Sequence, residues 1–302
     1  MTIAVTGATG FVGQALLDRA IAEDIPVRAL VRRDQPERKG VSWCAGDLGN
    51  VEALTRLMQG AEAVIHVAGV VNAAHGGEFE AGNVVGTLNV IEAALTAGVP
   101  RFVFVSSLSA REPLLSAYGQ SKARAEKLVK ASGLDWTIVR PPAIYGPRDR
   151  EMFELFRSAK WGVVPVPKGG RASLIHVDDL ARLLLALIPG GEHITHRVFE
   201  PDDGRRGGWT HEEMARAIGR AVGRRPKVLG LSRRTMELAV RADRMMRGHK
   251  AKLTLDRVGY MAHPDWVVSH GACPPHDIWR PRVETREGLT QTAQWYRQQG
   301  WL

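Results

Sequence analysis

The sequence predicts an α/β protein with a doubly wound, mainly parallel sheet and a small C-terminal cap. Short apolar, β-branched stretches alternate with amphipathic helical stretches as far as Pro141. These strand candidates are continuous apolar runs, which is typical of parallel strands that are covered on both faces. Beyond Pro141 the alternation is lost, as expected for a cap. We therefore expect seven strands, with helices on both faces of the sheet.

A glycine-rich turn joins the first strand to the first helix. The strand TIAVTG runs directly into TGATGFVG, and a helix is predicted over 11–22. Glycines allow a tight turn and close approach of the backbone, and the N-terminus of the following helix attracts a pyrophosphate. Because strand, turn and helix occur in this order, the pattern predicts a Rossmann-type dinucleotide site. The residues expected to contact the cofactor here are Gly7, Thr9, Gly10, Phe11, Val12 and Gly13.

The second strand, VRALVRR, ends about 20 residues after this turn, where a side chain faces the adenosine ribose. An acidic residue at that position favours NAD(H), but this chain has Arg32 and Arg33, followed by Asp34. Since an arginine can pair with a 2′-phosphate, we expect NADP(H) to be preferred, and Asp34 leaves NAD(H) open. After the third strand, Asp47 and Leu48 are expected to flank the adenine.

The remaining strands of the core are predicted in AEAVIHVAG, RFVFVSS and DWTIVRP, with helices over 51–58, 78–97 and 117–131. Residues at the strand ends are further candidates for cofactor contacts. They are Ala68 and Gly69 after the fourth strand, and Pro141 and Ala143 after the sixth. His66, at the end of the fourth strand, is expected to be structural rather than catalytic.

The later part of the chain predicts shorter elements. A helix is expected over 151–159, a strand and helix in SLIHVDDLARLLLALI, a strand in RVFEP and a closing helix in EGLTQTAQWYRQQGWL. Thr210 and Glu213 form a capping box that opens a helix toward Val222. We expect one unit over 1–302. Its dinucleotide-binding core lies mainly in 1–145, and its substrate-binding cap mostly in 146–302, with segments near 174–200 returning to the core.

The composition excludes several classes of protein. Two distant cysteines, Cys44 and Cys273, indicate neither a disulfide framework nor a metal cluster. No uninterrupted apolar stretch is long enough to span a bilayer, and the first residues do not resemble a signal peptide. A cytoplasmic protein is the resulting expectation. The net charge of +9 is concentrated in 204–257, which holds 15 Lys or Arg against 5 Asp or Glu.

The stretch SAYGQSK places Tyr118 and Lys122 four residues apart, on one face of the predicted helix. A phenol ionises near pH ~10, and a nearby positive charge lowers that pKa, which can make the phenol an acid or base at neutral pH. An exposed helix surface carrying an ordinary Tyr and Lys explains the same spacing. The pair alone does not decide between these interpretations.

Motifs along most of the chain resemble the extended and atypical branches of the short-chain dehydrogenase/reductase superfamily. They are TGATGFVG, DL, HVAG, NVVGT, FVFVSS, YGQSK, RPPAIYGP, IHVDDLA and the tail WYRQQGWL, in the family's order. The resemblance implies that Tyr118 is the catalytic acid/base. It also implies that Lys122 holds the nicotinamide ribose and lowers the tyrosine pKa, that Ser107 orients the substrate oxygen, and that Asn83 maintains the site.

The resemblance bears on several neighbouring residues. Ser106 and Ser109 compete with Ser107 for its role, and Ser106 is expected to point the other way. Tyr145 and Arg148 are expected to border a small-molecule substrate. His176, Asp178 and Asp179 are residues of the types that bind metal ions. The resemblance implies that they stabilise the fold instead, so no metal is predicted.

Three functions remain open from the sequence. The first is an NADP-dependent oxidoreductase acting on a small or lipid-like carbonyl or alcohol. The second is a nucleotide-sugar epimerase or dehydratase, and the third is a non-catalytic NADP(H)-binding scaffold. The Ser–Tyr–Lys set argues against a scaffold. Two departures argue against the second function. Related sugar dehydratases have an acidic pair where this chain has Leu108 and Ser109. Nucleotide-sugar enzymes often have a diphosphate-binding arginine where this chain has Ala172, with Arg171 one residue earlier. Substrate identity and formation of a homodimer are left open.

The basic segment contains a predicted helix over 233–247. Its apolar side would gather Leu238, Ala239, Ala242, Met245 and Met246, with Arg234, Glu237, Arg241 and Arg244 largely opposite. One interpretation is a cap helix with this apolar side on the core. The other is weak association with an anionic membrane surface. Nucleic acid is not an expected partner, because no aromatic residues interleave with the arginines.

Overall fold

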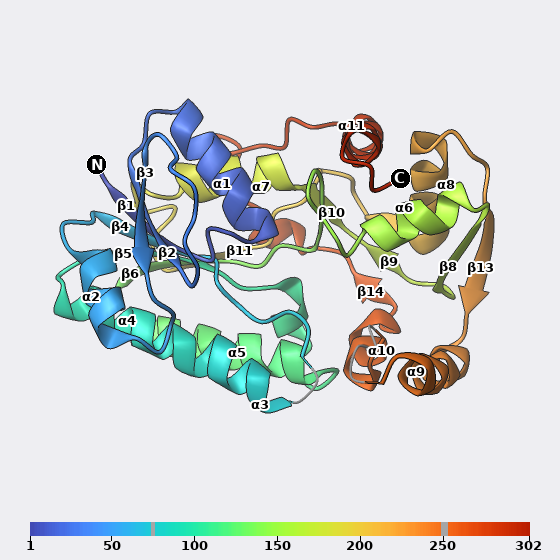
Figure 1. Ribbon diagram of the computed structural model, residues 1–302, viewed down its shortest axis with the longest axis horizontal. Helices are drawn as coiled ribbons and strands as arrows, with labels where there is room; N and C mark the ends of the chain where they lie inside the picture. Colours follow the sequence, from blue (N-terminus) through green and yellow to red (C-terminus); the bar gives the residue numbers. More distant parts are fainter. Residues whose placement is uncertain (74–75, 249–252) are drawn as a thin grey trace. The chain divides into compact units, whose positions relative to one another are not determined.

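The computed structural model describes residues 1–73, 76–248 and 253–302, and its chain forms two compact units (Figure 1). Unit 1 consists of Met1–Pro141, Asp178–Pro201 and Ala272–Arg280. Unit 2 consists of Pro142–Val177, Asp202–Gly271 and Pro281–Leu302. The change from one unit to the other therefore falls just before the expected end of the core. The segment Ala272–Arg280, which the sequence analysis placed in the cap, belongs to unit 1.

Unit 1 is built on a seven-stranded sheet in the order β11-β6-β5-β4-β1-β2-β3. All neighbouring strands run parallel, which confirms the predicted fold class. The central strands are buried on both faces, in keeping with their continuous apolar sequences. The strands are β1 (Ile3–Thr6), β2 (Val27–Val31), β3 (Val41–Ala45), β4 (Ala63–His66), β5 (Arg101–Val105), β6 (Asp135–Val139) and β11 (Arg197–Phe199).

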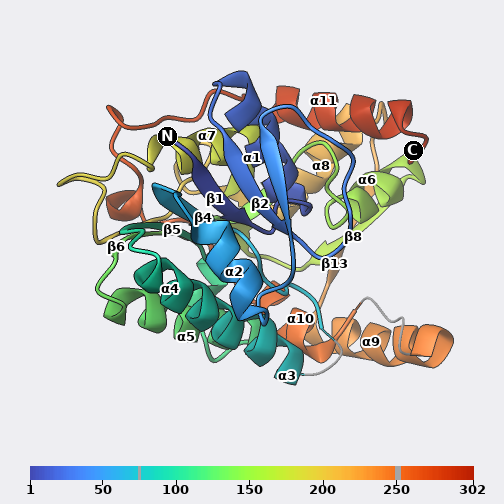
Figure 2. The ribbon, with the colours of Figure 1, turned by 60° about the vertical axis from the view of Figure 1, so that its left-hand side comes forward.

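Helices cover both faces of this sheet. Figures 1 and 2 show α1 (Phe11–Ala22) and α7 (Val177–Ala186) on one face, and α2 (Val51–Met58), α4 (Gly86–Thr96) and α5 (Ala117–Ala131) on the other. The second face contains an apolar core in which Leu54, Leu57, Phe102 and Phe104 are fully or almost fully buried. This packing fixes the positions of the carboxyl ends of the strands. Ligands bind beside these ends in open α/β sheets.

The single helix predicted over 78–97 is interrupted. The chain forms α3 (Gly76–Phe79), a π-helical stretch η1 (Glu80–Val85), and then α4. A π-helical turn holds more residues than an α-helical one, and such turns are frequent at functional sites. Here the wider turn contains Asn83, whose side-chain amide binds the backbone of Val70. The apolar periodicity of the segment did not indicate this irregularity.

Unit 2 combines short strands with helices α6 (Phe153–Lys160), α8 (His211–Ala221) and α11 (Thr285–Gln298), which share an apolar core. The predicted capping box is confirmed, since Thr210 and Glu213 bond reciprocally at the start of α8. Three small sheets complete the unit. They are β7 (Ala143–Tyr145) with β10 (Leu174–His176), β8 (Val163–Pro167) with β13 (Lys227–Leu231), and β9 (Arg171–Ala172) between β12 (Trp209–Thr210) and β14 (Asp265–Trp266).

Helix α9 (Arg233–Arg247) packs beside α10 (Leu255–Met261) through Met236, Val240 and Val258. Of the two interpretations given for this helix, packing of the side with Leu238, Met245 and Met246 on the core is wrong, because these three side chains are exposed. The helix carries apolar residues on both sides, and its periodicity alone does not show which side is covered. The side chains of Arg244 and Arg247 lie outside the described part of the structure.

Within the residues that the structure describes, no helix is both long and apolar enough to cross a membrane.

Candidate active site

The glycine turn after β1 forms a cradle that side chains would fill. The Gly10 amide donates to the Gly7 carbonyl at 3.0 Å, and Gly7 has a φ of +72°. A Cβ on Gly7 would lie 2.6 Å from the backbone nitrogen of Ala68, and one on Gly13 only 2.1 Å from the Gly7 oxygen. Gly10 caps α1 without a side-chain hydrogen bond, so the first amides of the helix keep their capacity to bind an anion. This arrangement fits a dinucleotide pyrophosphate.

We expect Gly13→Ala to destabilise the protein without cofactor by about 1–3 kcal/mol, because the added methyl group must displace backbone atoms. Gly10→Ala is the matched control. Its Cβ would lie 3.3 Å from the Gly7 oxygen, and the φ of Gly10 is −77°. Urea unfolding without cofactor measures the difference. If the two variants unfold at the same urea concentration, close packing of Gly13 does not stabilise the turn.

The segment after β2, where the sequence predicts the adenosine ribose to bind, is strongly basic. Arg32, Arg33 and Asp34 are all exposed. Neither guanidinium forms an ion pair with another described residue, whereas Arg38, further along the same connection, pairs with Asp18. Two arginine side chains therefore remain available to an anionic ligand at the end of the second strand.

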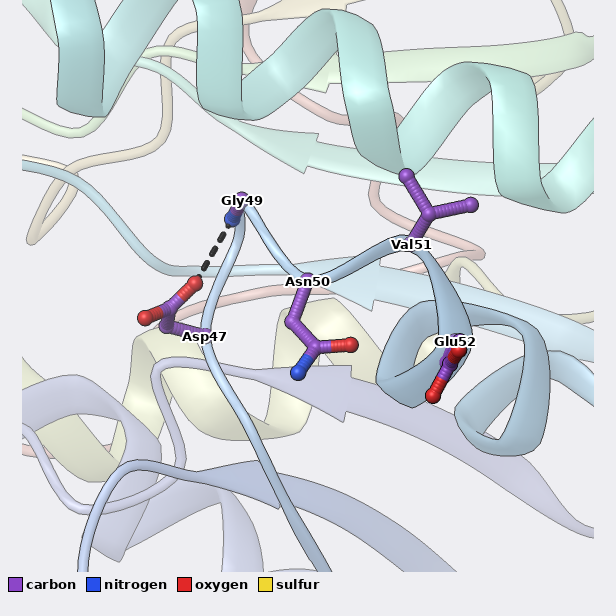
Figure 3. Close-up of a pocket in the computed structure, with 5 residues that line it drawn as sticks. All are labelled: Asp47, Gly49, Asn50, Val51 and Glu52. Atoms are coloured by element: carbon purple, nitrogen blue, oxygen red, sulfur yellow. Dashed lines mark hydrogen bonds between the residues drawn. The ribbon is translucent and has the colours of Figure 1, made fainter.

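A shallow pocket follows β3 and is lined by Asp47, Gly49, Asn50, Val51 and Glu52 (Figure 3). The Asp47 carboxylate accepts from the Gly49 amide at 2.8 Å, and the Asn50 side chain caps α2 by accepting from Ala53 at 2.9 Å. The second residue predicted here, Leu48, does not line this pocket. Its side chain packs on Gly86, where a Cβ would lie 2.7 Å from it. The contacts expected with adenine, a hydrogen bond from the Asp47 carboxylate and an apolar contact from Leu48, stay predictions.

Lys122 on α5 is buried, with 4% of its surface exposed. Its Nζ donates to the Val105 carbonyl at 2.9 Å and lies 4.9 Å from the centre of the Phe104 ring. Burial lowers the pKa of Lys122 to about 8, and attraction by Glu126 partly opposes this shift. A buried ammonium at the carboxyl end of the sheet is costly, and active sites often contain such groups.

Asn83 on η1 binds the loop that follows β4. Its Oδ1 accepts from the Val70 amide at 2.7 Å, and its Nδ2 donates to the Val70 carbonyl and to the Ser121 hydroxyl, each at 2.9 Å. A Cβ on Gly69 would lie 3.0 Å from this Oδ1 and 3.3 Å from Nζ of Lys122. Gly69, Asn83 and Lys122 therefore lie close together, and a side chain at position 69 would crowd both polar groups.

The serine turn after β5 packs on the first turn of α5. The Ser107 and Ser109 hydroxyls are 2.8 Å apart, and Ser107 caps the short helix η2 (Leu108–Arg111). A Cβ on Gly119 would lie 2.7 Å from the Ser109 carbonyl oxygen, so the turn lies against the residue that follows Tyr118. The Tyr118 ring is half-buried, 5.9 Å from the Phe79 ring. Gly119 was not predicted as a site residue, although it adjoins the predicted catalytic tyrosine.

Ser106 faces a separate, buried charge cluster. Its hydroxyl donates to Glu126 at 2.6 Å, and Glu126 also accepts two hydrogen bonds from Arg140, at 2.8 and 2.6 Å. Arg140 in turn pairs with Glu200 at 3.4 Å, and its bonds to Glu126 raise its pKa above the ordinary value. Glu126 was not predicted from the sequence. It lies four residues after Lys122, on the helix stripe that starts at Tyr118, and that spacing could have indicated it.

His66 is fully buried between two hydroxyls. The Thr87 hydroxyl donates its hydrogen to the Asn83 carbonyl at 2.6 Å. It must therefore accept the hydrogen bond from Nε2 of His66, at 3.0 Å. Nδ1 of His66 then carries no proton and accepts from the Thr6 hydroxyl at 2.6 Å. Burial, together with the charge of Lys122, lowers the pKa of His66 to about 3. The imidazole is therefore neutral and links Thr6 of β1 to Thr87 of α4.

The other predicted residues are divided between the units. In unit 1, the Pro141 carbonyl accepts from the Leu108 amide at 3.0 Å. The Asp178 carboxylate accepts from Arg19 through both oxygens, each at 2.8 Å. Asp179 forms an ion pair with Arg182. In unit 2, Ala143 and Tyr145 both lie on β7. Ala143 is exposed, whereas Tyr145 is fully buried, and the centre of its ring lies 5.2 Å from that of the His176 ring. Arg148 is exposed and has a φ of +74°. Among the described residues, no group of three or more His, Cys, Asp or Glu could hold a metal ion.

Comparisons with known proteins agree with this geometry. A family model described as NAD(P)H-binding matches residues 7–189, more than half of the chain. The ceramide reductase of Caulobacter vibrioides (strain NA1000 / CB15N) is 38% identical over 310 aligned residues, covering 99% of this chain and 96% of that protein. The chain belongs to the extended short-chain dehydrogenase/reductase superfamily. The family model indicates NAD(P)H binding, and the similarity to a reductase over almost the whole chain indicates an enzyme.

Two further relatives show how the similarity is distributed. The 4-hydroxy-2-methyl-3-oxo-4-farnesyl-3,4-dihydroquinoline-1-oxide ketoreductase of Stigmatella aurantiaca is 34% identical over 221 residues, covering 62% of this chain and 65% of that protein. The structure of MoeE5 in complex with UDP-glucuronic acid and NAD superposes with a TM-score of 0.75 over 99% of both chains, at 22% identity. This enzyme of the short-chain dehydrogenase/reductase superfamily thus shares its fold with MoeE5, and its sequence is more similar to the two reductases.

Proposed function

We propose that this enzyme is an NADPH-dependent ketoreductase that acts on the carbonyl group of a lipid-like substrate. The proposal rests chiefly on the meeting of Lys122, Asn83 and Gly69 beside the serine turn that precedes α5. These residues create a positively charged, water-poor position at the carboxyl end of the sheet, next to the predicted acid/base Tyr118. Two relatives whose names describe reductases of lipid-like compounds support the substrate class.

In the proposed reaction, Ser107 and Tyr118 donate hydrogen bonds to the carbonyl oxygen of the substrate. When bound, NADPH would supply the hydride to the carbonyl carbon. The Tyr118 hydroxyl transfers its proton to the oxygen as negative charge develops there, and solvent returns a proton to Tyr118 after the alcohol leaves. The ammonium of Lys122 stabilises the phenolate that exists between these two steps. The hydrogen bonds of Asn83 to Val70 and Ser121 hold the loop after β4 beside Lys122.

The preference for NADPH depends on Arg32 and Arg33. We expect Arg32→Gln/Arg33→Gln to weaken NADPH binding about 10- to 100-fold, as expected for loss of a charged hydrogen-bonded pair, and to leave NADH binding nearly unchanged. Titrations with both cofactors at one fixed ionic strength measure this, because salt screens a phosphate contact. Lys39→Gln, which removes an exposed positive charge further along the same connection, is the control. Equal losses for NADPH and NADH would assign the ribose phosphate contact to other residues.

Consumption of NADPH with candidate substrates tests the reaction itself. A ketone of the ceramide type, dispersed in detergent micelles, should be reduced to its alcohol, and a water-soluble ketone without long chains should react far more slowly. UDP-glucose should neither bind nor react. Reduction of the ceramide-type ketone that does not need NADPH, or that persists at the wild-type rate in Tyr118→Phe, would contradict the proposal.

The epimerase alternative draws on the UDP-glucose 4-epimerase of Vibrio cholerae, which is 29% identical over 67% of this chain. Arg171 is the residue nearest to the position of a diphosphate-binding arginine. Its guanidinium is engaged by the backbone, since it donates to the Gly207 carbonyl at 2.5 Å and the Gly208 carbonyl at 3.5 Å. Tight binding of a UDP-sugar, lost in Arg171→Gln, would favour the epimerase.

A further inference from the structure

The exposed side of α9 carries several large apolar side chains. Leu238, Met245 and Met246 are 61%, 86% and 81% exposed, and Ala242 between them is exposed as well. Leu238, Ala242 and Met245 are spaced at i, i+4 and i+7, so they form one continuous stripe. The helix is anchored from its other side, where Met236 and Val240 pack on Val258, and where the Asp243 carboxylate accepts from the Leu253 amide at 3.1 Å. None of the residues that the structure describes covers this stripe.

Arginines border this stripe. Arg234 lies four residues before Leu238 and Arg241 three residues after it, so both share its side of the helix, and both are exposed. The expectation that these two arginines lie largely opposite the side with Leu238 was therefore wrong. Across its whole length α9 has five arginines against two acids, Glu237 and Asp243. An apolar stripe with flanking arginines is the pattern of helices that lie in the plane of a membrane surface, where the apolar side chains enter the acyl boundary and the guanidinium groups reach lipid phosphates.

We propose that α9 docks this enzyme on the surface of an anionic phospholipid bilayer. The charge of the helix favours this partner over a second copy of the chain, because a two-fold symmetric contact would bring two equally basic helices together. It favours lipid over nucleic acid, because α9 contains no aromatic side chain that could stack on bases. Docking of this kind extends the proposed function by bringing the enzyme to the phase in which lipid-like substrates dissolve, but it does not depend on that function.

Co-sedimentation of the full-length protein with vesicles tests the proposal without any substrate. Vesicles of phosphatidylglycerol and phosphatidylcholine should bind the protein at low salt, and pure phosphatidylcholine vesicles should not. Arg234→Gln/Arg241→Gln should weaken binding roughly 10- to 30-fold, at about 1 kcal/mol for each cation near the surface. Leu238→Gln/Met245→Gln should weaken it at least about tenfold, because the membrane then gains no apolar area from the stripe.

Two control pairs separate this site from general surface effects. Leu88→Gln/Leu95→Gln removes two leucines, 37% and 49% exposed, at the same i, i+7 spacing on α4. Arg216→Gln/Arg220→Gln removes two exposed arginines from α8. Both control pairs should bind vesicles like the wild type. No binding to anionic vesicles at low salt overturns the proposal, as does unchanged binding of Leu238→Gln/Met245→Gln. A dimer in light scattering that this same variant abolishes would instead identify the stripe as an interface between two copies.

Discussion

Tyr118→Phe should lower the turnover number roughly 100- to 10,000-fold, the usual contribution of general acid–base catalysis. Phenylalanine keeps the ring that lies beside Phe79 and removes only the hydroxyl group, so the site should keep its packing. The loss should therefore appear in the chemical step, and the dissociation constant for NADPH should change little. Turnover with the ceramide-type ketone and a fluorescence titration with NADPH measure the two quantities separately.

Tyr296→Phe is the matched control for this prediction. The Tyr296 hydroxyl donates to the Asp149 carbonyl at 2.6 Å in the core of unit 2, so its loss should reduce stability by about 1 kcal/mol and leave the turnover number unchanged. If Tyr118→Phe turns over at the wild-type rate, the proton comes from another group. In that case Ser107 and Ser109, whose hydroxyls lie 2.8 Å apart, are the next residues to replace.

Lys122→Met should abolish most activity and remove the contribution of Lys122 to the pH dependence of stability. The methionine keeps much of the volume of the lysine but has neither the charge nor the hydrogen bond to Val105. Turnover should fall by at least about 100-fold, because no cation then stabilises the phenolate of Tyr118. NADPH should also bind more weakly, since the predicted contact with the ribose is lost.

The stability effect follows from the lowered pKa. Folded Lys122 releases its proton near pH 8, whereas the unfolded side chain does so near its ordinary value of 10.5. Between these values the unfolded chain binds more protons, so the free energy of unfolding of the wild type rises with pH in this window. Below pH 8 both forms are protonated, and the folded protein bears the full cost of burying the charge. Relative to Lys122→Met, the wild type should gain about 3 kcal/mol across the window.

Urea unfolding of both proteins at several pH values from 7 to ~10.5 measures this difference, and other titrating groups cancel in the comparison. Lys127→Met, an exposed lysine on the same helix, should differ from the wild type by an amount that does not change with pH. A constant difference between the wild type and Lys122→Met would mean that Lys122 is not desolvated in the folded protein.

The sequence by itself determined the fold class and the order of its parts. Continuous apolar strands separated by amphipathic helices require a sheet covered on both faces, and the seven parallel strands follow from that pattern. Three local features could also be predicted from the sequence, because their geometry depends on residues close together in the chain. They are the glycine turn at Gly7–Gly13, the capping box at Thr210 and the four-residue spacing of Tyr118 and Lys122.

Only the tertiary structure decided what depends on distant neighbours. It placed Gly69 between Asn83 and Lys122, joined Ser106 to Glu126 and Arg140, and converted the turn around Asn83 to a π-helix, all through contacts between segments far apart in sequence. It also decided which side of α9 is buried. Met236 and Val240 pack on Val258 of another helix, and the periodicity of α9 alone does not predict this contact. Leu238 and Met245, which are equally apolar, face solvent instead.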